Sequence, residues 1–228
     1  MRLLLTRHGR TASNVAALLD TAPPGPDLDL VGRAQAVALS GRVTGQRIGG
    51  VYSSDLVRAV QTAEPVAEAF GVTATVLPGL REIPGGHYEM TADVRDYVAV
   101  LRSWGEGDRA ARVPGGESGE EFLHRFDSAI RRIAEDGVAG ALVVSHGAAM
   151  RAWSSHAMPE VHAVLGHRGM PNTTVIVADG DPDDGWRLLG IDFPEVDSDD
   201  GFAKPSLYQE ISAQPRGSEL GDPGSRPG

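Results

Sequence analysis

The sequence predicts an α/β domain with three layers (α/β/α), in which helices cover both faces of a mostly parallel central sheet. Short apolar segments alternate with longer segments of helical periodicity along the first 194 residues. Two of the apolar segments, residues 3–6 and 141–144, show no regular alternation with polar residues, as is typical of strands buried on both faces. In such a sheet the ligand site lies at the carboxyl ends of the strands.

The first half of the chain contains three strand candidates. The expected elements are strands at 3–6, 51–52 and 73–77, and helices at 12–19, at 31–43 and before Gly71. Asp29 precedes the second of these helices and offers it an N-cap, because its carboxylate can accept hydrogen bonds from the free N–H groups of the first turn. Ser53, Ser54 and Asp55 offer caps to the third helix.

The second half begins with a Gly-rich turn at 84–86 and a polar stretch with a weaker helical pattern. Ser118, with Glu121 three residues later, has the spacing of a capping box. The segment from Asp179 to Gly185 resembles the start of a calcium-binding loop but lacks that loop's glycine and glutamate, so we expect an acidic turn and no metal site. The other expected elements are a helix at 120–135, a strand at 141–144, a helix after Gly147, and a hairpin of strands at 173–178 and 186–192.

Length, net charge and cysteine content exclude several classes of protein and of binding partner. The 228 residues predict one domain at 1–194 and an acidic tail rich in Pro, Gly and Ser at 195–228, with too few apolar positions to order itself. The formal net charge of -10 argues against nucleic acid and anionic membranes as partners. Cysteine is absent, which removes thiol nucleophiles and cysteine-ligated metals. The N-terminal apolar stretch is too short for a signal peptide, so we expect a cytoplasmic protein. The sequence is compatible with a homodimer.

Two histidines mark the expected site. His8 and His146 each follow a predicted buried strand and precede a glycine, so they converge if the two strands are parallel neighbours. Arg7, beside His8, and Arg58, in the first turn of a predicted helix, would reach the same edge of the sheet. Two arginines, two histidines and helix N-termini suit the tetrahedral dianion of a phosphate monoester. Glu82 follows the third strand and would stand beside that site.

Four segments together resemble the histidine phosphatase superfamily, the phosphoglycerate mutase-like group, over most of residues 1 to 193. They are the runs LTRHGRTASN, SSDLVRAVQTA, LREI and VVSHG, which contain His8, Arg58, Glu82 and His146. The resemblance implies a phosphoglycerate mutase-like fold, with His8 as the nucleophile that becomes phosphohistidine and Glu82 as the proton donor. It also implies a phosphate pocket of Arg7, Arg58 and His146, with further substrate contacts from Asn14, Thr21 and Gly147.

The expected chemistry needs neither a metal nor a cofactor. A neutral His8 imidazole attacks phosphorus without the repulsion that an anionic nucleophile would meet, and the covalent intermediate divides one difficult step into two. The arginines and a protonated His146 would stabilise the equatorial oxygens. Glu82 would protonate the leaving alkoxide and then activate water, although Glu89 and Asp93 are nearby alternatives.

Three functions stay open, and a phosphatase acting on a small phosphorylated metabolite is preferred. A cofactor-dependent phosphoglycerate mutase is the first alternative. The interval between Glu82 and His146 lacks the longer basic segment of such mutases; it offers arginines such as those at 95, 102, 109 and 112 but no lysine. The second is a noncatalytic phosphoester-binding module, which would need neither His8 nor Glu82. Arg10 and Met90 depart from the family pattern. Because of these two departures the identity of the substrate is not predicted.

Overall fold

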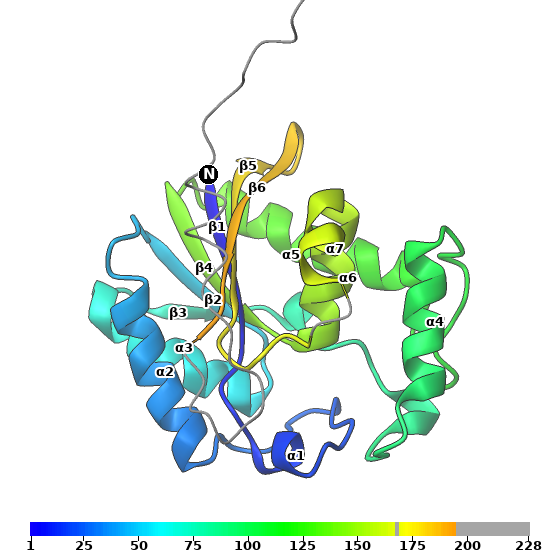
Figure 1. Cartoon of the computed structure of the whole chain (residues 1–228). Coiled ribbons are helices and arrows are strands. Elements are labelled where there is room, and N and C mark those ends of the chain that lie inside the picture. Colours follow the sequence, from blue (N-terminus) through cyan, green and yellow to red (C-terminus); the bar gives the residue numbers. More distant parts are fainter. Residues whose placement is uncertain (167–168, 195–228) are drawn as a thin grey trace, which may run out of the picture.

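A mixed sheet of six strands forms the centre of the molecule (Figure 1). The computed structural model describes residues 1–166 and 169–194, so the tail expected at 195–228 lies outside the described residues. The strand order is β3-β2-β4-β1-β5-β6, with parallel pairing from β3 to β1 and antiparallel pairing of β5 with β1 and β6. The strands are β1 (Arg2–Arg7), β2 (Gly50–Ser53), β3 (Ala74–Val76), β4 (Gly140–Ser145), β5 (Val175–Asp181) and β6 (Gly185–Asp192).

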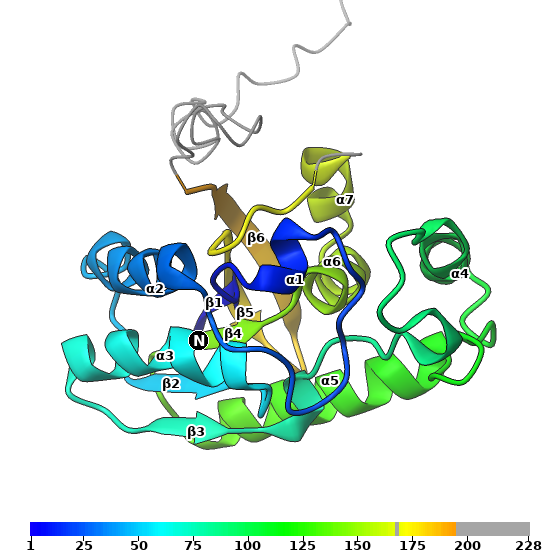
Figure 2. The same ribbon diagram turned by 90° about the horizontal axis from the view of Figure 1, so that it is seen from below.

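Helices cover both faces of this sheet, which confirms the predicted three layers (Figure 2). α2 and α3 pack on one face, and α5, α6 and α7 lie on the other, with α4 beyond them. The helices are α1 (Ala12–Val15), α2 (Leu30–Arg42), α3 (Val57–Phe70), α4 (Arg95–Gly105), α5 (Gly119–Glu135), α6 (Gly147–Ala157) and α7 (Pro159–Leu165). Within residues 1–166 and 169–194, no helix has both the length and the apolar character needed to cross a membrane.

The central strands are buried on both faces. In β1, Leu4 packs with α2 and α3, whereas Leu3 and Leu5 pack with the helices of the opposite layer. Each of the three is 1% exposed, and complete burial of such a side chain contributes roughly 1.5–3 kcal/mol. This two-sided burial explains the continuous apolar run and holds β1 firmly in the middle of the sheet.

Two helix caps are confirmed and two local predictions are wrong. Asp29 Oδ1 accepts from Gly32 N at 2.7 Å, and Ser118 and Glu121 form the capping box that opens α5. α3, however, has Leu56 at its N-cap and no side-chain cap, because Ser54 bonds to His146 and Asp55 pairs with Arg81. The first helix ends at Val15 rather than residue 19, since the chain turns through a left-handed residue at position 17.

The loop after β1 packs closely against the first turn of α2. A Cβ at Gly32 would overlap the carbonyl oxygen of Arg10, and a Cβ at Gly9 would lie 2.6 Å from the carbonyl oxygen of Gly32. Backbone therefore meets backbone at the two residues that follow His8. The glycines fix the path of the chain directly beyond that histidine.

We expect Gly32→Ala to lower the free energy of unfolding by roughly 1–3 kcal/mol, because the added methyl group forces these two backbones apart. Gly41→Ala on the same helix is the control, since a Cβ there meets nothing within 4 Å. That variant should be neutral or more stable by up to about 1 kcal/mol. Urea unfolding measures both, and equal effects would show that the close approach carries no stability.

Candidate active site

β1 and β4 bring His8 and His146 together at the carboxyl edge of the sheet. The parallel register pairs Arg7 with Ser145, so the residue after each strand faces the same region. The two imidazole centroids lie 5.1 Å apart, and both side chains are buried. The convergence predicted from the sequence is present, and it follows from the neighbouring positions of the two strands.

The hydrogen bonds of His8 define which nitrogen can attack. Nδ1 lies 2.7 Å from the carbonyl oxygen of Gly9, and because a carbonyl only accepts, Nδ1 must carry the hydrogen. The lone pair is then on Nε2, which accepts from Arg58 Nε at 3.1 Å. Nε2 is therefore the nucleophilic atom of this imidazole.

Burial lowers the pKa of His8 well below its usual value, and the positive charges of Arg58 and Arg7 lower it further. The pKa of His146 is lowered for the same reasons, with burial first and then the charges of Arg58, His8 and Arg7. Burial and the adjacent guanidinium charges thus favour the neutral form of both imidazoles. The protonated His146 that we expect from the sequence beside a phosphate in the transition state stays a prediction.

Three buried nitrogens around His8 have no hydrogen-bond partner among the residues that the structure describes. They are Arg7 Nε, Arg58 Nη1 and His146 Nδ1. The other ring nitrogen of His146 bonds to Ser54 Oγ at 2.7 Å. Ser54 is fully buried, and among the described residues its hydroxyl hydrogen has no acceptor other than this nitrogen. Ser54 therefore donates to His146, and the free Nδ1 carries a hydrogen.

These orphaned donors define an oxyanion site. A buried donor without a partner costs about 1–3 kcal/mol, and the oxygens of an anionic ligand would satisfy such donors. Burial lowers the pKa of Arg7 and of Arg58, and the negative charge of Glu82 raises both. Arg58 is also fixed by donating from Nη2 to the carbonyl oxygen of Asp20 at 2.9 Å. The arrangement suits a tetrahedral oxyanion placed against His8 Nε2.

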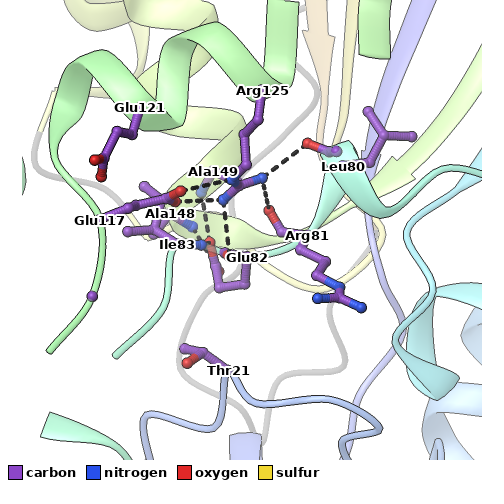
Figure 3. Close-up of polar contacts among 12 residues, drawn as sticks. Thr21, Leu80, Arg81, Glu82, Ile83, Glu117, Glu121, Arg125, Ala148 and Ala149 are labelled. Carbon is purple, nitrogen blue, oxygen red and sulfur yellow. Dashed lines mark hydrogen bonds and ion pairs between the residues drawn. The ribbon is translucent and has the colours of Figure 1, made fainter. Parts of the chain in front are cut away.

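Glu82 is held at the N-terminus of α6. Its carboxylate accepts from the backbone N–H groups of Ile83, Ala148 and Ala149 at 2.9, 3.1 and 2.7 Å (Figure 3). α6 begins at Gly147, where a Cβ would lie 3.4 Å from Arg7 Nε. Glu82 therefore reaches the same helix start as His146 and lines a pocket of about 280 Å³.

Two alternatives to Glu82 have other roles in the structure. The Glu89 carboxylate accepts from Thr21 N at 2.6 Å, from Ala22 N at 3.0 Å and from the Thr21 hydroxyl. It ties the loop at 21–22 to the turn after Glu82. Asp93 forms an exposed ion pair with Arg95. Glu82 is the carboxylate that contacts the start of α6.

Asn14 and Thr21 lie at the rim of the site and already bond to protein groups. Asn14 Oδ1 accepts from Asn172 Nδ2 at 3.1 Å, and the same amide group donates to the carbonyl oxygen of His8 at 2.9 Å. The Thr21 hydroxyl accepts from Gly85 N at 2.7 Å while it donates to Glu89. Sequence reasoning missed Ser54 as a partner of His146 and Asn172 as a support of His8, since no local pattern marks either.

Comparison with known proteins identifies the family to which the chain belongs. The family model of the histidine phosphatase superfamily (branch 1) matches residues 3–192. The chain therefore belongs to the histidine phosphatase superfamily, and its fold is the phosphoglycerate mutase-like α/β fold that the sequence predicts.

Individual relatives carry names of different kinds. The chain is 34% identical over 155 residues to the probable phosphoglycerate mutase GpmB of Yersinia pestis, covering 66% of this chain and 71% of that protein. It is 31% identical over 207 residues to the PE-PGRS family protein PE_PGRS11 of Mycobacterium tuberculosis, covering 82% of this chain. The match spans only 35% of that relative's length.

Solved structures are similar over nearly their whole length. A mycobacterial glucosyl-3-phosphoglycerate phosphatase, solved with VO3, is 27% identical with a TM-score of 0.68, covering 82% of this chain and 96% of that one. A putative alpha-ribazole-5'-P phosphatase from Escherichia coli is 26% identical with a TM-score of 0.65, covering 82% and 94%.

The lowered pKa values predict how stability depends on pH. In the unfolded chain the two histidines titrate near about 6.5, whereas in the fold both stay neutral to lower pH. The unfolded state therefore binds more protons as the pH falls below about 6.5, and the free energy of unfolding decreases by up to about 1.4 kcal/mol per histidine and pH unit.

Urea unfolding of the phosphate-free protein at a series of pH values checks this. We expect the double variant His8→Gln, His146→Gln to lose less stability between about pH 6.5 and 5 than the native chain, because it has no imidazole to protonate there. Identical slopes would show that the two histidines are not held neutral. His124→Gln, an exposed position on α5, serves as the control and should leave the slope unchanged.

Proposed function

We propose that this protein is a phosphatase that hydrolyses a small phosphate monoester through a phosphohistidine on His8 Nε2. The observation that carries the proposal is the set of three unpartnered buried donors, from Arg7, Arg58 and His146, around a neutral imidazole. A tetrahedral phosphate would satisfy those donors and place its phosphorus in front of the lone pair. The superfamily membership supports the same reaction class.

The reaction has two displacements. His8 Nε2 attacks phosphorus, the bond from phosphorus to the ester oxygen breaks, and Glu82 donates a proton to the leaving alkoxide. Water then attacks phosphorus, Glu82 accepts a proton from that water, the phosphorus–nitrogen bond breaks and phosphate leaves. Arg7, Arg58 and His146 Nδ1 donate to the equatorial oxygens as charge spreads over them.

The pocket beside Glu82 favours a small leaving group. It has a volume of about 280 Å³ and is lined by Thr21, Ala22, Pro23, Arg81, Glu82, Pro84, Gly86 and Glu89. The hydroxyl, guanidinium and carboxylates on this wall suit a hydroxylated metabolite. The phosphatases with similar structures act, by their names, on glucosyl-3-phosphoglycerate and on alpha-ribazole 5'-phosphate, so these two are the first candidates to test.

A mutase remains the second candidate because of the similarity to a probable phosphoglycerate mutase. A mutase has to hold a second charged group of its substrate. Three of the four arginines named for this role are engaged elsewhere: Arg95 pairs with Asp93, Arg112 pairs with Glu121, and Arg109 bonds to His156. Their positions favour transfer to water.

We expect a transient mass increase of one phosphoryl group when the protein is mixed with p-nitrophenyl phosphate, with release of free phosphate. His8→Ala should lose the adduct and at least about 10³-fold of the activity, because the covalent route needs the imidazole. His124→Ala is the control and should keep both. Intact-protein mass spectrometry and a phosphate assay measure the outcome, with 3-phosphoglycerate, glucosyl-3-phosphoglycerate and alpha-ribazole 5'-phosphate as further substrates.

Other results would replace the proposal. A stable phosphoenzyme formed from a bisphosphoglycerate, with isomerised phosphoglycerate and little free phosphate, indicates the mutase. Binding of inorganic phosphate without turnover of any of these esters indicates the noncatalytic module. An active His8→Ala variant removes His8 as the nucleophile.

A further inference from the structure

Five consecutive backbone carbonyls, at residues 79–83, accept hydrogen bonds from side chains. Ser145 Oγ donates to the carbonyl of residue 80 at 2.8 Å, and the Tyr97 hydroxyl donates to that of residue 83 at 2.9 Å. Burial raises the pKa of Tyr97 well above its usual value, with the Glu82 and Glu117 charges adding to the effect, so this hydroxyl stays a donor. Side-chain donors thus fix every peptide of the segment that carries Glu82.

Arg125 makes the other three of these contacts. Nη1 donates to the carbonyl oxygens of Gly79 and Arg81 at 2.9 and 3.0 Å, and Nη2 donates to that of Glu82 at 3.1 Å (Figure 3). Arg125 belongs to α5, which lies under the sheet face opposite α2 and α3. One guanidinium therefore joins α5 to the backbone of the segment around Glu82.

Glu117 fixes the orientation of that guanidinium. Its two carboxylate oxygens accept from Arg125 Nε at 2.8 Å and from Nη2 at 2.6 Å. The ion pair is largely buried, with side-chain exposures of 23% for Arg125 and 13% for Glu117. Arg125 also lies over the ring of Phe122, 5.0 Å from its centroid. A planar guanidinium held on three sides presents its remaining N–H groups in a fixed geometry.

Glu82 is consequently held at both ends. Arg125 binds its carbonyl oxygen, and the N–H groups at the start of α6 bind its carboxylate. Figure 3 shows the contacts of Arg125 with Glu117 and with the backbone of Glu82, and those of Ala148 and Ala149 with the Glu82 carboxylate. Loss of the backbone anchor would let the carboxylate move relative to His8, and misplacement of a catalytic group by about 1 Å can cost about 10²-fold in rate.

We propose that Arg125, oriented by Glu117, is a positioning residue for Glu82 and thereby controls the protonation of the leaving group. The proposal rests on the proposed function, because it assigns Glu82 the transfer of a proton to the ester oxygen. Arg125 does not line the pocket, and its action passes through the backbone of residues 79–82. Its loss should therefore affect poor leaving groups, which need the proton, more than good ones.

The experiment compares phenyl phosphate, which has a poor leaving group, with p-nitrophenyl phosphate, which has a good one. The measured quantity is kcat/KM, which reports on transfer of the phosphoryl group to His8. The variant Arg125→Met, Glu117→Gln removes the ion pair without leaving a buried unpaired carboxylate. We expect kcat/KM to fall about tenfold more for phenyl phosphate than for p-nitrophenyl phosphate, with Arg125→Lys intermediate.

The matched control is Arg112→Met, Glu121→Gln. This pair also joins an arginine to a glutamate of the same region through two hydrogen bonds, but it is about half exposed and binds none of the carbonyls at 79–83. We expect its kcat/KM ratio between the two esters to equal that of the native chain. Glutamine at position 121 keeps the capping box, so α5 retains its start.

Glu82→Gln provides the second comparison. It should lower kcat/KM about 10²-fold more for phenyl phosphate than for p-nitrophenyl phosphate. Adding Arg125→Met and Glu117→Gln to Glu82→Gln should leave the kcat/KM ratio of the two esters unchanged. Equal losses for the two esters, or added discrimination in the Glu82→Gln background, would overturn the positioning role while leaving the phosphatase intact. If Glu82→Gln itself shows no discrimination, the acid assignment is wrong and the positioning role falls with it.

Discussion

The hydrogen bond from Arg58 Nε to His8 Nε2 sets the constraint on which the rest of the structure depends. It places a buried cation against the lone pair of Nε2; burial first, and then this positive charge, lower the pKa of His8, while one nitrogen of the same guanidinium has no partner among the described residues. The nearby carboxylates of Glu82, Asp20 and Glu89 raise the pKa of Arg58 and oppose the effect of its burial. A strong anion site and a reactive base can therefore exist in the same small volume.

The fold meets this constraint by placing each group at the end of a helix or strand or by tying it to one. His8 and His146 follow the two central parallel strands, Arg58 stands in the first turn of α3, and Glu82 is tied between α5 and α6. No member of this set depends on a long free loop. Backbone hydrogen bonds and buried ion pairs hold these groups in the fixed geometry that the proposed phosphoryl transfer needs.

The sequence predicted the parts that depend on local patterns. The apolar runs gave the strands, the Asp29 cap and the Ser118–Glu121 capping box gave two helix starts, and adjacent strand ends explained why His8 and His146 meet. The sequence did not predict interactions between distant segments. Ser54 was expected to cap α3, yet its hydroxyl bonds to His146, and the protonation of His146 depends on burial that no single-sequence pattern reports.

The same limit applies to Arg125 and Glu117, which lie eight residues apart and act together on a segment more than thirty residues earlier. Another consequence follows from the resting contact between Arg58 and His8. The only lone pair able to attack is masked by a guanidinium until an anion draws that group away, and the imidazole itself is buried. An uncharged electrophile, such as an alkylating agent, offers nothing to displace the guanidinium. If His8 is the nucleophile that we propose, this contact shields it from uncharged reagents and leaves it accessible to anionic esters.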